Sequence, residues 1–462
     1  MTAVAAISPA RKAAFDVLLA LERTADRGNA HADDLLRSKT VDALSPADRH
    51  LATTLVLGVL RWQILLDAQL KLLLTKTRKK LDPEVSIALR MGAFQLQFLD
   101  RIPAHAAIDE SVELTKQSGH RFASGLVNAV LRKVAAAGPA VSPSEETADE
   151  LALAQAHPAW LVERWTRFYG LEAARSICRY GQAQPQKTIR LVDPAAETEM
   201  LASGMILESA AILTVARTVV SGDITATAAY REGRARIQDE GSQLIAELAA
   251  CSTDLDQKVR SIGDTCAAPG GKTLILAERN PQAHILACES SQRRFAELSE
   301  RLAAHADRVE CRLADATTLN EDSAFDLFLA DVPCSGTGTL SRNPEIRHRL
   351  RPEDLPRHAE RQRAILSVAL RSVRPGGHVV YSTCSLEPEE NEQVIAAVLA
   401  GNQSTRQVSL GPRIEGLAQS GVLTASGAAQ LRDCLRPDGA LRLLPGALPT
   451  DGFFVALIEK QS

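Results

Sequence analysis

The chain has 462 residues, too many for one ordinary domain, so we expect two or three domains. Hydrophobic residues make up 45% of it and charged residues 24%, which excludes wholesale disorder and predicts a core of normal size. The net charge of -3 gives no global sign of a nucleic-acid partner, although residues 1–138 hold 19 Lys and Arg against 14 Asp and Glu. This asymmetry suggests a basic N-terminal surface for a partner, but ordinary scatter of surface charge explains it better.

Neither a membrane span nor a secretion signal is expected. The longest apolar stretch, Leu51 to Leu74, is interrupted by Arg61, Asp67 and Lys71, which is typical of buried helices in a soluble domain. The N-terminal apolar run contains charged residues and lacks a cleavage pattern of small residues. We therefore expect a cytoplasmic protein with no membrane partner.

The N-terminal half divides by composition. Residues 9–135 are predicted to be all-helical, because apolar residues recur at helical spacing and Gly and Pro lie between the periodic runs. Residues 138–150 are rich in Pro, Ser and acidic residues, which is typical of a linker. Beyond them, a helix over His157–Tyr169 and a strand over Lys187–Val192 favour a small α+β module. The predicted domains are residues 1–138, residues 139–236 (linker and module) and residues 237–462.

In the C-terminal part, short apolar runs alternate with stretches of helical length. This alternation predicts an α/β domain with a mainly parallel, doubly wound sheet covered by helices on both faces. The predicted strands are Val259–Thr265, His284–Glu289, Arg308–Leu313, Phe325–Asp331, His378–Thr383 and Phe453–Ile458. The predicted helices are Lys272–Arg279, Gln292–Ala304 and His358–Ser372.

A loop of small residues, GDTCAAPGGKT (Gly263–Thr273), joins the first of these strands to the next helix. Small residues let the backbone approach a ligand, and the helix N-terminus offers free N–H groups. A nucleotide-binding P-loop would need glycine where this chain has Cys266, and Pro269 lies within the loop. The spacing therefore disfavours ATP or GTP hydrolysis, and the lack of G-x-G-x-x-G disfavours NAD and FAD.

Three carboxylates follow successive strands. Glu289 ends the second strand, where an acidic residue can accept hydrogen bonds from a ribose diol. Asp315 follows the third strand and Asp331 ends the fourth. Each alone is equally well explained as a turn residue or helix cap, but together they indicate one ligand-binding edge.

Eight cysteines occur, and none forms a C-x-x-C pair, so no metal site is predicted. Most should be reduced, buried thiols. Cys334 and Cys384 differ, because they follow the fourth and fifth strands beside small and hydroxyl residues. Since these strand ends can be neighbours in a doubly wound sheet, we predict that the two thiols converge on one site.

The motifs CAAPGGKT, DVPCSGTGTLSRNPEIR and YSTCSLEPEENE strongly resemble those of the Sun family of RNA cytosine-5 methyltransferases. The segments IQDEGSQ and RLLPG…DGFF are also similar to that family. Within it, the likeness is greatest to bacterial enzymes acting on small-subunit ribosomal RNA, whose N-terminal domain is similar to the antitermination factor NusB. ADRHLATTLVLGVLRW, MGAFQLQFLDRIPAHAAIDESVEL and GLVNAVLRK carry that part of the likeness.

The resemblance implies S-adenosylmethionine as cofactor, small-subunit ribosomal RNA as partner and no obligatory protein partner. It implies that the methionine portion of the cofactor is cradled by Cys266, Ala267, Ala268, Pro269, Gly270, Gly271 and Lys272. Glu289 would hold the ribose, Asp315 would lie near the adenine, and Asp331 near the transferred methyl group. Family members often carry Asp at the position of Glu289, and Glu keeps the acceptor with a longer reach.

The resemblance also implies that Cys384 is the nucleophile and that Cys334 helps to release the product. Attack of a thiolate at C6 of cytosine breaks the aromaticity of the ring and makes C5 nucleophilic, so that C5 can take the methyl group from the sulfonium. In DNA cytosine methyltransferases the cysteine of the Pro-Cys motif attacks instead, so the reversed assignment stays open.

RNA contacts are expected in the basic stretch after the Pro-Cys motif, where Arg342, Arg347 and Arg349 are predicted to meet phosphates near an extruded cytosine. The alternative is a solvated loop. Two other functions also remain open: a methyltransferase for protein or small molecules, and a NusB-like RNA-binding assembly factor with an inactive methyltransferase fold.

Overall fold

The computed structural model describes residues 7–24, 31–74, 81–138, 144–251 and 259–461. By their internal contacts, these residues form two compact units. Unit 1 spans residues 1–184 and 340–350, and unit 2 spans residues 185–339 and 351–462. This division places residues 139–184 of the predicted middle segment in unit 1 and residues 185–236, which hold its strands, in unit 2, so the three-part division stays a prediction. Residues 139–143 of the predicted linker lie outside the described residues.

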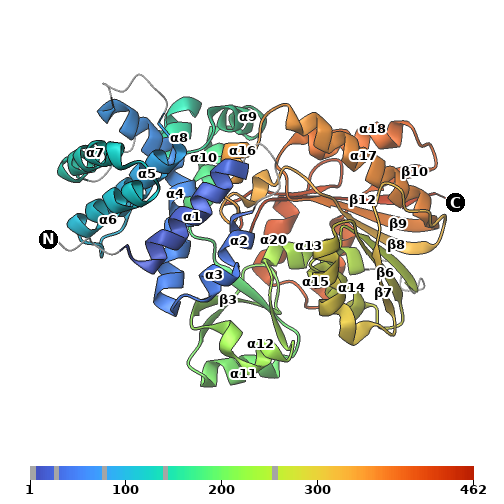
Figure 1. The fold of residues 1–462 in the computed structure, drawn as a ribbon. Coiled ribbons are helices and arrows are strands. Elements are labelled where there is room, and N and C mark those ends of the chain that lie inside the picture. Colours follow the sequence, from blue (N-terminus) through green and yellow to red (C-terminus); the bar gives the residue numbers. More distant parts are fainter. Residues whose placement is uncertain (1–6, 25–30, 75–80, 139–143, 252–258, 462) are drawn as a thin grey trace. The chain divides into compact units, whose positions relative to one another are not determined.

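Unit 1 is helical, as predicted for its first part (Figure 1). Its helices are α1 (Pro9–Thr24), α2 (Ala32–Leu36), α3 (Lys39–Asp42), α4 (Pro46–Leu73), α5 (Pro83–Phe98), α6 (Ala104–Gln117), α7 (Ser124–Ala137), α8 (Ala148–Ala154), α9 (Ala159–Tyr169), α10 (Leu171–Gln182) and α16 (Ile346–Arg349). Proline occupies the first position of both α4 and α5, where its missing N–H has no intrahelical partner to lose. The hydroxyl of Ser45 caps α4 by accepting the N–H of Asp48 at 3.1 Å.

Helix α4 lies at the centre of the apolar core of unit 1. Leu55, Val56 and Leu66 on this helix are completely buried and pack in one cluster with residues of α1, α5 and α7. Among the described helices, α4 is long and apolar enough to cross a membrane by length and composition. Its Asp67 accepts two hydrogen bonds from Arg90 of α5, at 2.7 and 2.8 Å. These contacts are those of a core helix, as predicted from its charged residues.

Unit 2 begins with a small antiparallel sheet, followed along the chain by the larger sheet. The small sheet has the order β2-β3-β1-β4. Its strands are β1 (Lys187–Leu191), β2 (Ile206–Ser209), β3 (Ala216–Ser221) and β4 (Ala235–Ile237), with the helices α11 (Ala195–Ala202) and α12 (Ala228–Arg231) between them. Strand β1 confirms the predicted strand over Lys187–Val192.

Buried ion pairs connect the small sheet to the rest of unit 2. Arg190 of β1 is 3% exposed and lies 2.9 Å from Glu247 and 3.1 Å from Glu278. Glu247 also accepts two hydrogen bonds from Arg279, at 2.7 and 2.9 Å. Removing one partner from such a network would leave an unpaired charge in the interior. These pairs therefore fix how the small sheet packs on the helices behind it.

The larger sheet has the order β10-β12-β9-β8-β5-β6-β7, with β11 paired to β12 (Figure 1). Strands β5 to β9 run parallel to one another, and β12 runs antiparallel to β9, β10 and β11. The strands are β5 (Ser261–Thr265), β6 (His284–Glu289), β7 (Val309–Leu313), β8 (Phe325–Asp331), β9 (Val373–Thr383), β10 (Thr405–Val408), β11 (Leu441–Leu443) and β12 (Phe453–Lys460). The chain starts at β5 and builds outward in both directions, which confirms the predicted mainly parallel, doubly wound sheet.

Helices cover both faces of this sheet, as predicted. They are α13 (Glu240–Ala250), α14 (Gly271–Arg279), α15 (Gln292–Leu302), α17 (Asp354–Ser372), α18 (Glu392–Ala400), α19 (Gly411–Gln419) and α20 (Ala425–Asp433). Alternate residues of β8 divide between two cores. Leu327 and Leu329 belong to the cluster with α13 and α14, whereas Phe328 and Ala330 belong to the cluster with α17 and α18.

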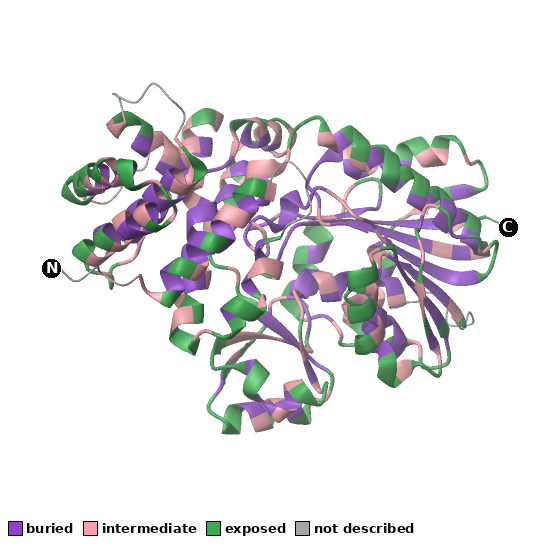
Figure 2. Cartoon of the chain, in the orientation of Figure 1, coloured by how far each residue is buried: buried purple, intermediate pink, exposed green. Residues whose placement is uncertain are grey.

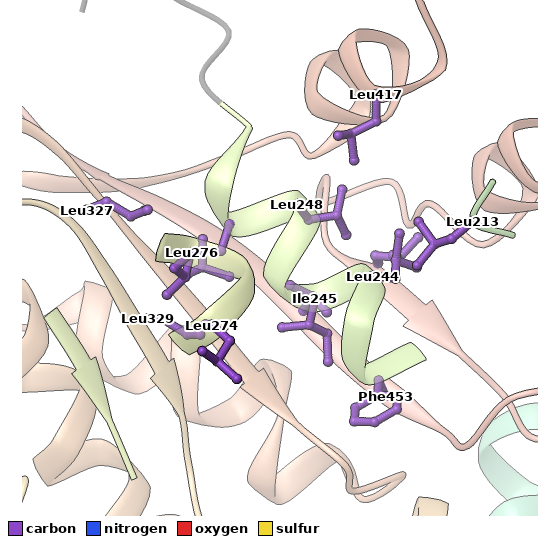
Figure 3. Close-up of a cluster of buried hydrophobic side chains, with 14 of the residues drawn as sticks. Leu213, Leu244, Ile245, Leu248, Leu274, Leu276, Leu327, Leu329, Leu417 and Phe453 are labelled. Atoms are coloured by element: carbon purple, nitrogen blue, oxygen red, sulfur yellow. The ribbon is translucent and has the colours of Figure 1, made fainter. Parts of the chain in front are cut away.

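The first of these cores is drawn in Figure 3. Leu244, Ile245 and Leu248 of α13 are completely buried and share a cluster with Leu274 of α14 and Phe453 of β12. Figure 2 shows the central strands of the sheet buried along nearly their whole length. Each such apolar side chain contributes about 1.5–3 kcal/mol on burial, so the sheet is a rigid support for its loops.

The sequence predicted β6 and β8 to the residue but underestimated β9. Strand β9 starts at Val373, five residues before the predicted His378. The segment Pro375-Gly376-Gly377 interrupts the alternation of apolar and polar residues there and is typical of a turn. In the structure, Val373 before this segment already pairs with Phe325 of β8. The strands β10 and β11 and the helices α13 and α18 to α20 were not predicted.

Candidate functional site

The loop after β5 has the tight backbone geometry that its sequence suggested. Cys266 and Gly270 have φ angles of 56° and 95°, and Gly270 caps the N-terminus of α14. The N–H of Ala267 donates to the carbonyl of Cys288 at 2.9 Å. Arg294 of α15 donates to the carbonyl of Ala268 at 2.6 Å. The loop is thereby held against the next strand with its backbone close to the edge of the sheet.

A pocket of about 240 Å³ lies over this loop. It is lined by Cys266, Ala267, Ala268, Pro269, Gly271 and Lys272 of the loop, together with residues that include Gln238, Asp264 and Asp331. The structure therefore brings most of the predicted cradle together with the carboxylate that ends β8. Burial raises the pKa of the Cys266 thiol to about 12, and the charges of Glu289 and Asp331 add to this effect. Cys266 is consequently an inert thiol and not a competing nucleophile.

Glu289 ends β6, 3% exposed, on the same edge of the sheet. Its Oε1 accepts the N–H of Ser291 at 2.9 Å. Its Oε2 is buried and has no hydrogen-bond partner among the described residues, although Arg294 lies 3.7 Å away. An unsatisfied buried carboxylate oxygen is costly, and hydroxyl donors of a ligand would satisfy it. The residues present thus fit a ligand with a ribose diol.

Asp315 lies beyond the end of β7 and is exposed. Its carboxylate accepts the N–H and the hydroxyl of Thr317, both at 2.9 Å. These hydrogen bonds lower the pKa of Asp315, which keeps it charged. Its predicted contact with adenine stays a prediction.

Asp331 ends β8 and is held from two sides. Its Oδ2 accepts a hydrogen bond from Lys272 at 2.7 Å, and its Oδ1 accepts one from the hydroxyl of Ser382 at 2.6 Å. Burial lowers the pKa of Lys272, but the charge and hydrogen bond of Asp331 outweigh it, so the pKa is raised overall. Lys272 is therefore a fixed positive charge that orients Asp331 at the edge of the sheet.

Asp264 lies behind this pair, 1% exposed, and accepts a hydrogen bond from Thr273 at 2.6 Å. Burial raises the pKa of its carboxyl from 3.8 to about 7, against the opposing effect of Thr273, and the charge of Asp331 raises it further. The folded protein therefore keeps a proton on Asp264 where the unfolded chain has released it.

This raised pKa predicts a pH-dependent effect of Asp264→Asn. Between about pH 4 and pH 7 the unfolded chain binds fewer protons here, so ionisation of Asp264 lowers the free energy of unfolding as pH rises. Asparagine removes this ionisation and keeps an acceptor for Thr273. We expect the free energy of unfolding of the variant, minus that of wild type, to be about 2–3 kcal/mol larger at pH 8 than at pH 5, as measured by urea unfolding. A wild-type-to-variant difference that is the same at both pH values would contradict the assignment.

The two predicted catalytic cysteines meet, as expected from their positions after neighbouring strands. The Sγ atoms of Cys334 and Cys384 are 3.3 Å apart, and both residues are half-buried. The pKa of Cys334 is raised well above its ordinary value by its contact with the sulfur of Cys384 and by burial. Cys334 therefore stays protonated, in hydrogen-bonding contact with the sulfur of Cys384.

Backbone hydrogen bonds join the loops that carry these cysteines. The N–H of Gly338 donates to the carbonyl of Cys384 at 2.9 Å, and the N–H of Gly452 donates to the carbonyl of Gly338 at 2.8 Å. A side chain at position 338 would place its Cβ 2.4 Å from the carbonyl oxygen of Gly452, so glycine is required for this approach. The Pro-Cys, Thr-Cys and DGFF motifs are thus in contact through their backbones.

A buried network around these loops was not found from the sequence. Glu390 accepts hydrogen bonds from Ser335, Ser385 and Gln362. The signal available was the serine that follows each cysteine, but sequence alone does not show that both face the same carboxylate.

The segment IQDEGSQ also has a structural role. Asp239 caps α13 by accepting the N–H groups of Gly241 and Ser242, at 2.9 and 3.2 Å. Glu240 accepts the N–H groups of Ile212 and Leu213, both at 2.7 Å. The motif therefore fixes the start of α13 next to the pocket.

The prediction that Arg347 contacts RNA is contradicted by its burial. Arg347 is 3% exposed and donates to the carbonyls of Gly181 at 2.6 Å and Arg61 at 2.9 Å within unit 1. Its guanidinium is an internal connector of that unit, so it does not face a phosphate. Arg342 and Arg349 are half-buried on the same segment, and Arg349 lies 3.2 Å from the Nδ1 of His31.

Comparisons with known proteins agree with this architecture. The model of the family described as 16S rRNA methyltransferase RsmB/F matches residues 254–459, and the NusB family model matches residues 8–136. The chain is 33% identical to the probable ribosomal RNA small subunit methyltransferase B of Bacillus subtilis, over 98% of each chain. It is 32% identical to the ribosomal RNA small subunit methyltransferase B of Pseudomonas putida, over 80% of this chain and 85% of that one.

Solved structures share the fold. The crystal structure of PH0851 has a TM-score of 0.76 and 23% identity, and the match covers 98% of this chain and 99% of that one. The crystal structure of NSun6 from Pyrococcus horikoshii has a TM-score of 0.54 and 19% identity, over 67% of this chain and 99% of that one. Because a relative matches this chain over 98% of its length at 33% identity, the chain belongs to the Sun family, among the ribosomal RNA small subunit methyltransferases that carry an N-terminal NusB domain.

Proposed function

We propose that this protein transfers a methyl group from S-adenosylmethionine to C5 of a cytosine in small-subunit ribosomal RNA, through a transient bond between Cys384 and C6 of the base. The observation that carries the proposal is the 3.3 Å approach of two thiols beside the Asp331–Lys272 pair. Methylation of a nitrogen or oxygen that is already nucleophilic needs no thiol. Methylation of C5 in the aromatic ring of cytosine does need a thiol, because attack at C6 must first make C5 electron-rich.

In this proposal the residues divide the work. The Sγ of Cys384 forms a bond to C6, and the electron pair moves to C5. Bound S-adenosylmethionine would supply an electrophilic methyl group on a sulfonium. Asp331, held by Lys272 and Ser382, would lie beside the target base and fix its exocyclic amino group by accepting a hydrogen bond. The transfer would leave S-adenosylhomocysteine as the leaving group. C5 then loses its proton to water, and the electrons of that C–H bond re-form the C5–C6 double bond while the bond between C6 and the Sγ of Cys384 breaks and its electron pair returns to the sulfur.

Cys334 would act in this last step. Its raised pKa keeps a proton on its sulfur, next to the sulfur that must leave C6. A thiol at contact distance stabilises the departing thiolate of Cys384 by hydrogen bonding. Loss of Cys334 should therefore slow release more than attack.

The cofactor site would be formed by Cys266 to Lys272, Glu289 and Asp315. The unsatisfied Oε2 of Glu289 would accept the ribose hydroxyls. We expect Glu289→Gln to weaken binding of S-adenosylmethionine about tenfold or more, because the amide turns a donor toward those hydroxyls. Titration calorimetry measures this, with Glu297→Gln on the exposed face of α15 as the charge-matched control. Unchanged affinity in Glu289→Gln would remove this residue from the site.

RNA contact by Arg342 and Arg349 remains part of the proposal. If both meet phosphates, replacing them with glutamine should lower affinity for RNA and reduce the slope of affinity against salt concentration.

The experiment that tests the function is bisulfite sequencing of small-subunit ribosomal RNA from a strain lacking this protein. We expect one 5-methylcytosine to disappear, to return with the wild-type chain and to stay absent with Cys384→Ala. If no 5-methylcytosine disappears, the cytosine-5 assignment is refuted.

A further inference from the structure

Glu390 lies at the end of a short 3₁₀ turn (Pro388–Glu390) and is completely buried. Its Oε1 accepts the N–H of Ser335 at 2.8 Å and the amide of Gln362 at 2.9 Å. Its Oε2 accepts the hydroxyl of Ser385 at 2.5 Å and also the hydroxyl of Ser335. A buried carboxylate is tolerated when donors satisfy it in this way, so its position is defined by these groups.

These partners are not arbitrary, because Ser335 and Ser385 directly follow Cys334 and Cys384. The two serine hydroxyls are 3.1 Å apart, and the two cysteine sulfurs are 3.3 Å apart. One carboxylate oxygen therefore joins the loop after β8 to the loop after β9, one residue from each thiol. The two loops lie 50 residues apart in the chain, so the distance between the sulfurs depends on contacts between the loops, which include this carboxylate and the backbone hydrogen bond from Gly338 to Cys384.

The carboxylate is itself anchored on the scaffold. The amide of Gln362, on α17, also donates to the carbonyl of Pro333 at 3.0 Å. The hydroxyl of Tyr381 on β9 donates to the backbone carbonyl of Glu390 at 2.6 Å. The position of Glu390 is thus fixed by a helix and a strand.

We propose that Glu390 is a positioning residue that holds the Cys334 and Cys384 sulfurs in contact by binding the serine after each of them. Its consequence for catalysis rests on the function proposed above, in which both thiols act on one base. Without the carboxylate, the loops would still fold but the sulfurs would sample longer separations. Attack of Cys384 on the base and its release with the help of Cys334 would then no longer be coupled by the contact between the two sulfurs.

The test measures how fast the two sulfurs can be cross-linked in the absence of RNA and cofactor, which depends on how close together they are held. Diamide oxidises two adjacent thiols to a disulfide, and peptide mass mapping identifies the Cys334–Cys384 cross-link among the other cysteines. We expect rapid cross-linking in wild type and a rate reduced about tenfold or more in Glu390→Gln, because the amide cannot accept at both of its ends. Glu389→Gln, one residue away and half-exposed, is the charge-matched control and should cross-link at the wild-type rate.

A double variant, Ser335→Ala with Ser385→Ala, removes the donors instead of the acceptor. It should show the same slow cross-linking, and it keeps the test open if Glu390→Gln is poorly folded by circular dichroism. Wild-type cross-linking rates in a folded Glu390→Gln or in the double variant would overturn the proposal, as would slow cross-linking in wild type or in Glu389→Gln.

A second measurement separates this proposal from the proposed function. In methylation assays, Glu390→Gln should lower kcat about tenfold or more and leave the KM for S-adenosylmethionine unchanged, whereas general unfolding would change the amount of active enzyme and the melting temperature. If wild type does not methylate cytosine at all, the proposed function fails. The cross-linking rates would still decide whether Glu390 positions the two thiols.

Discussion

Cys384→Ala is expected to reduce methyl transfer to cytosine at least about a thousandfold, because without a covalent bond at C6 the C5 carbon stays part of an aromatic ring. The measurement is transfer of labelled methyl groups from S-adenosylmethionine to small-subunit RNA in single-turnover conditions. Folding should survive, since Cys384 is half-buried and its removal leaves no unsatisfied hydrogen-bonding group of high cost.

The matched control is Cys434→Ala, another half-buried thiol of unit 2 that lies outside the site. Both variants should melt within a few degrees of wild type, and only Cys384→Ala should lose activity. If Cys384→Ala retained a tenth or more of wild-type turnover, a covalent mechanism through this sulfur would be excluded. Methylation of a protein or a small molecule would then become the better explanation.

Cys334→Ala is expected to give the opposite phenotype: accumulation of enzyme joined covalently to RNA. Cys384 can still attack C6 in this variant. The departing sulfur loses the thiol 3.3 Å away that stabilises it, so release becomes slow. The adduct should appear as a slowly migrating band on a denaturing gel after incubation with RNA and S-adenosylmethionine.

The double variant Cys334→Ala with Cys384→Ala is the control. It should give no slowly migrating band, because the bond to RNA goes through Cys384. A band with Cys384→Ala and none with Cys334→Ala would reverse the two roles. That outcome would resemble the assignment in DNA cytosine methyltransferases. It is the natural alternative, because the two sulfurs are in contact and either geometry brings a thiol close to the base.

Much of unit 2 was predictable because its signals are local. Strands β6 and β8 alternate between the two cores and end in Glu289 and Asp331, and the structure has these bounds. The predicted start of β9 was wrong by five residues. The segment Pro375-Gly376-Gly377 is typical of a turn, although Val373 before it pairs with β8. Local pattern cannot show a bulge that is set by the neighbouring strand.

The error on Arg347 has a similar origin. A basic residue after the Pro-Cys motif is ordinarily exposed, and nothing in its neighbours signals burial. Its guanidinium is satisfied by carbonyls of Arg61 and Gly181, which lie 286 and 166 residues away in the chain. Only the folding of unit 1 brings those acceptors to it.

The sequence alone determined strands β5 to β9 and β12 with helices α14, α15 and α17, the loop of small residues after β5 and the two cysteines that follow β8 and β9. These depend on periodicity and turn chemistry within about ten residues, which the chain carries locally. The tertiary structure decided that the two sulfurs touch, that Glu390 joins the serines beside them and that Arg347 is internal. Such contacts depend on which strands become neighbours and on which distant donors satisfy a buried charge, and no short stretch of sequence specifies either.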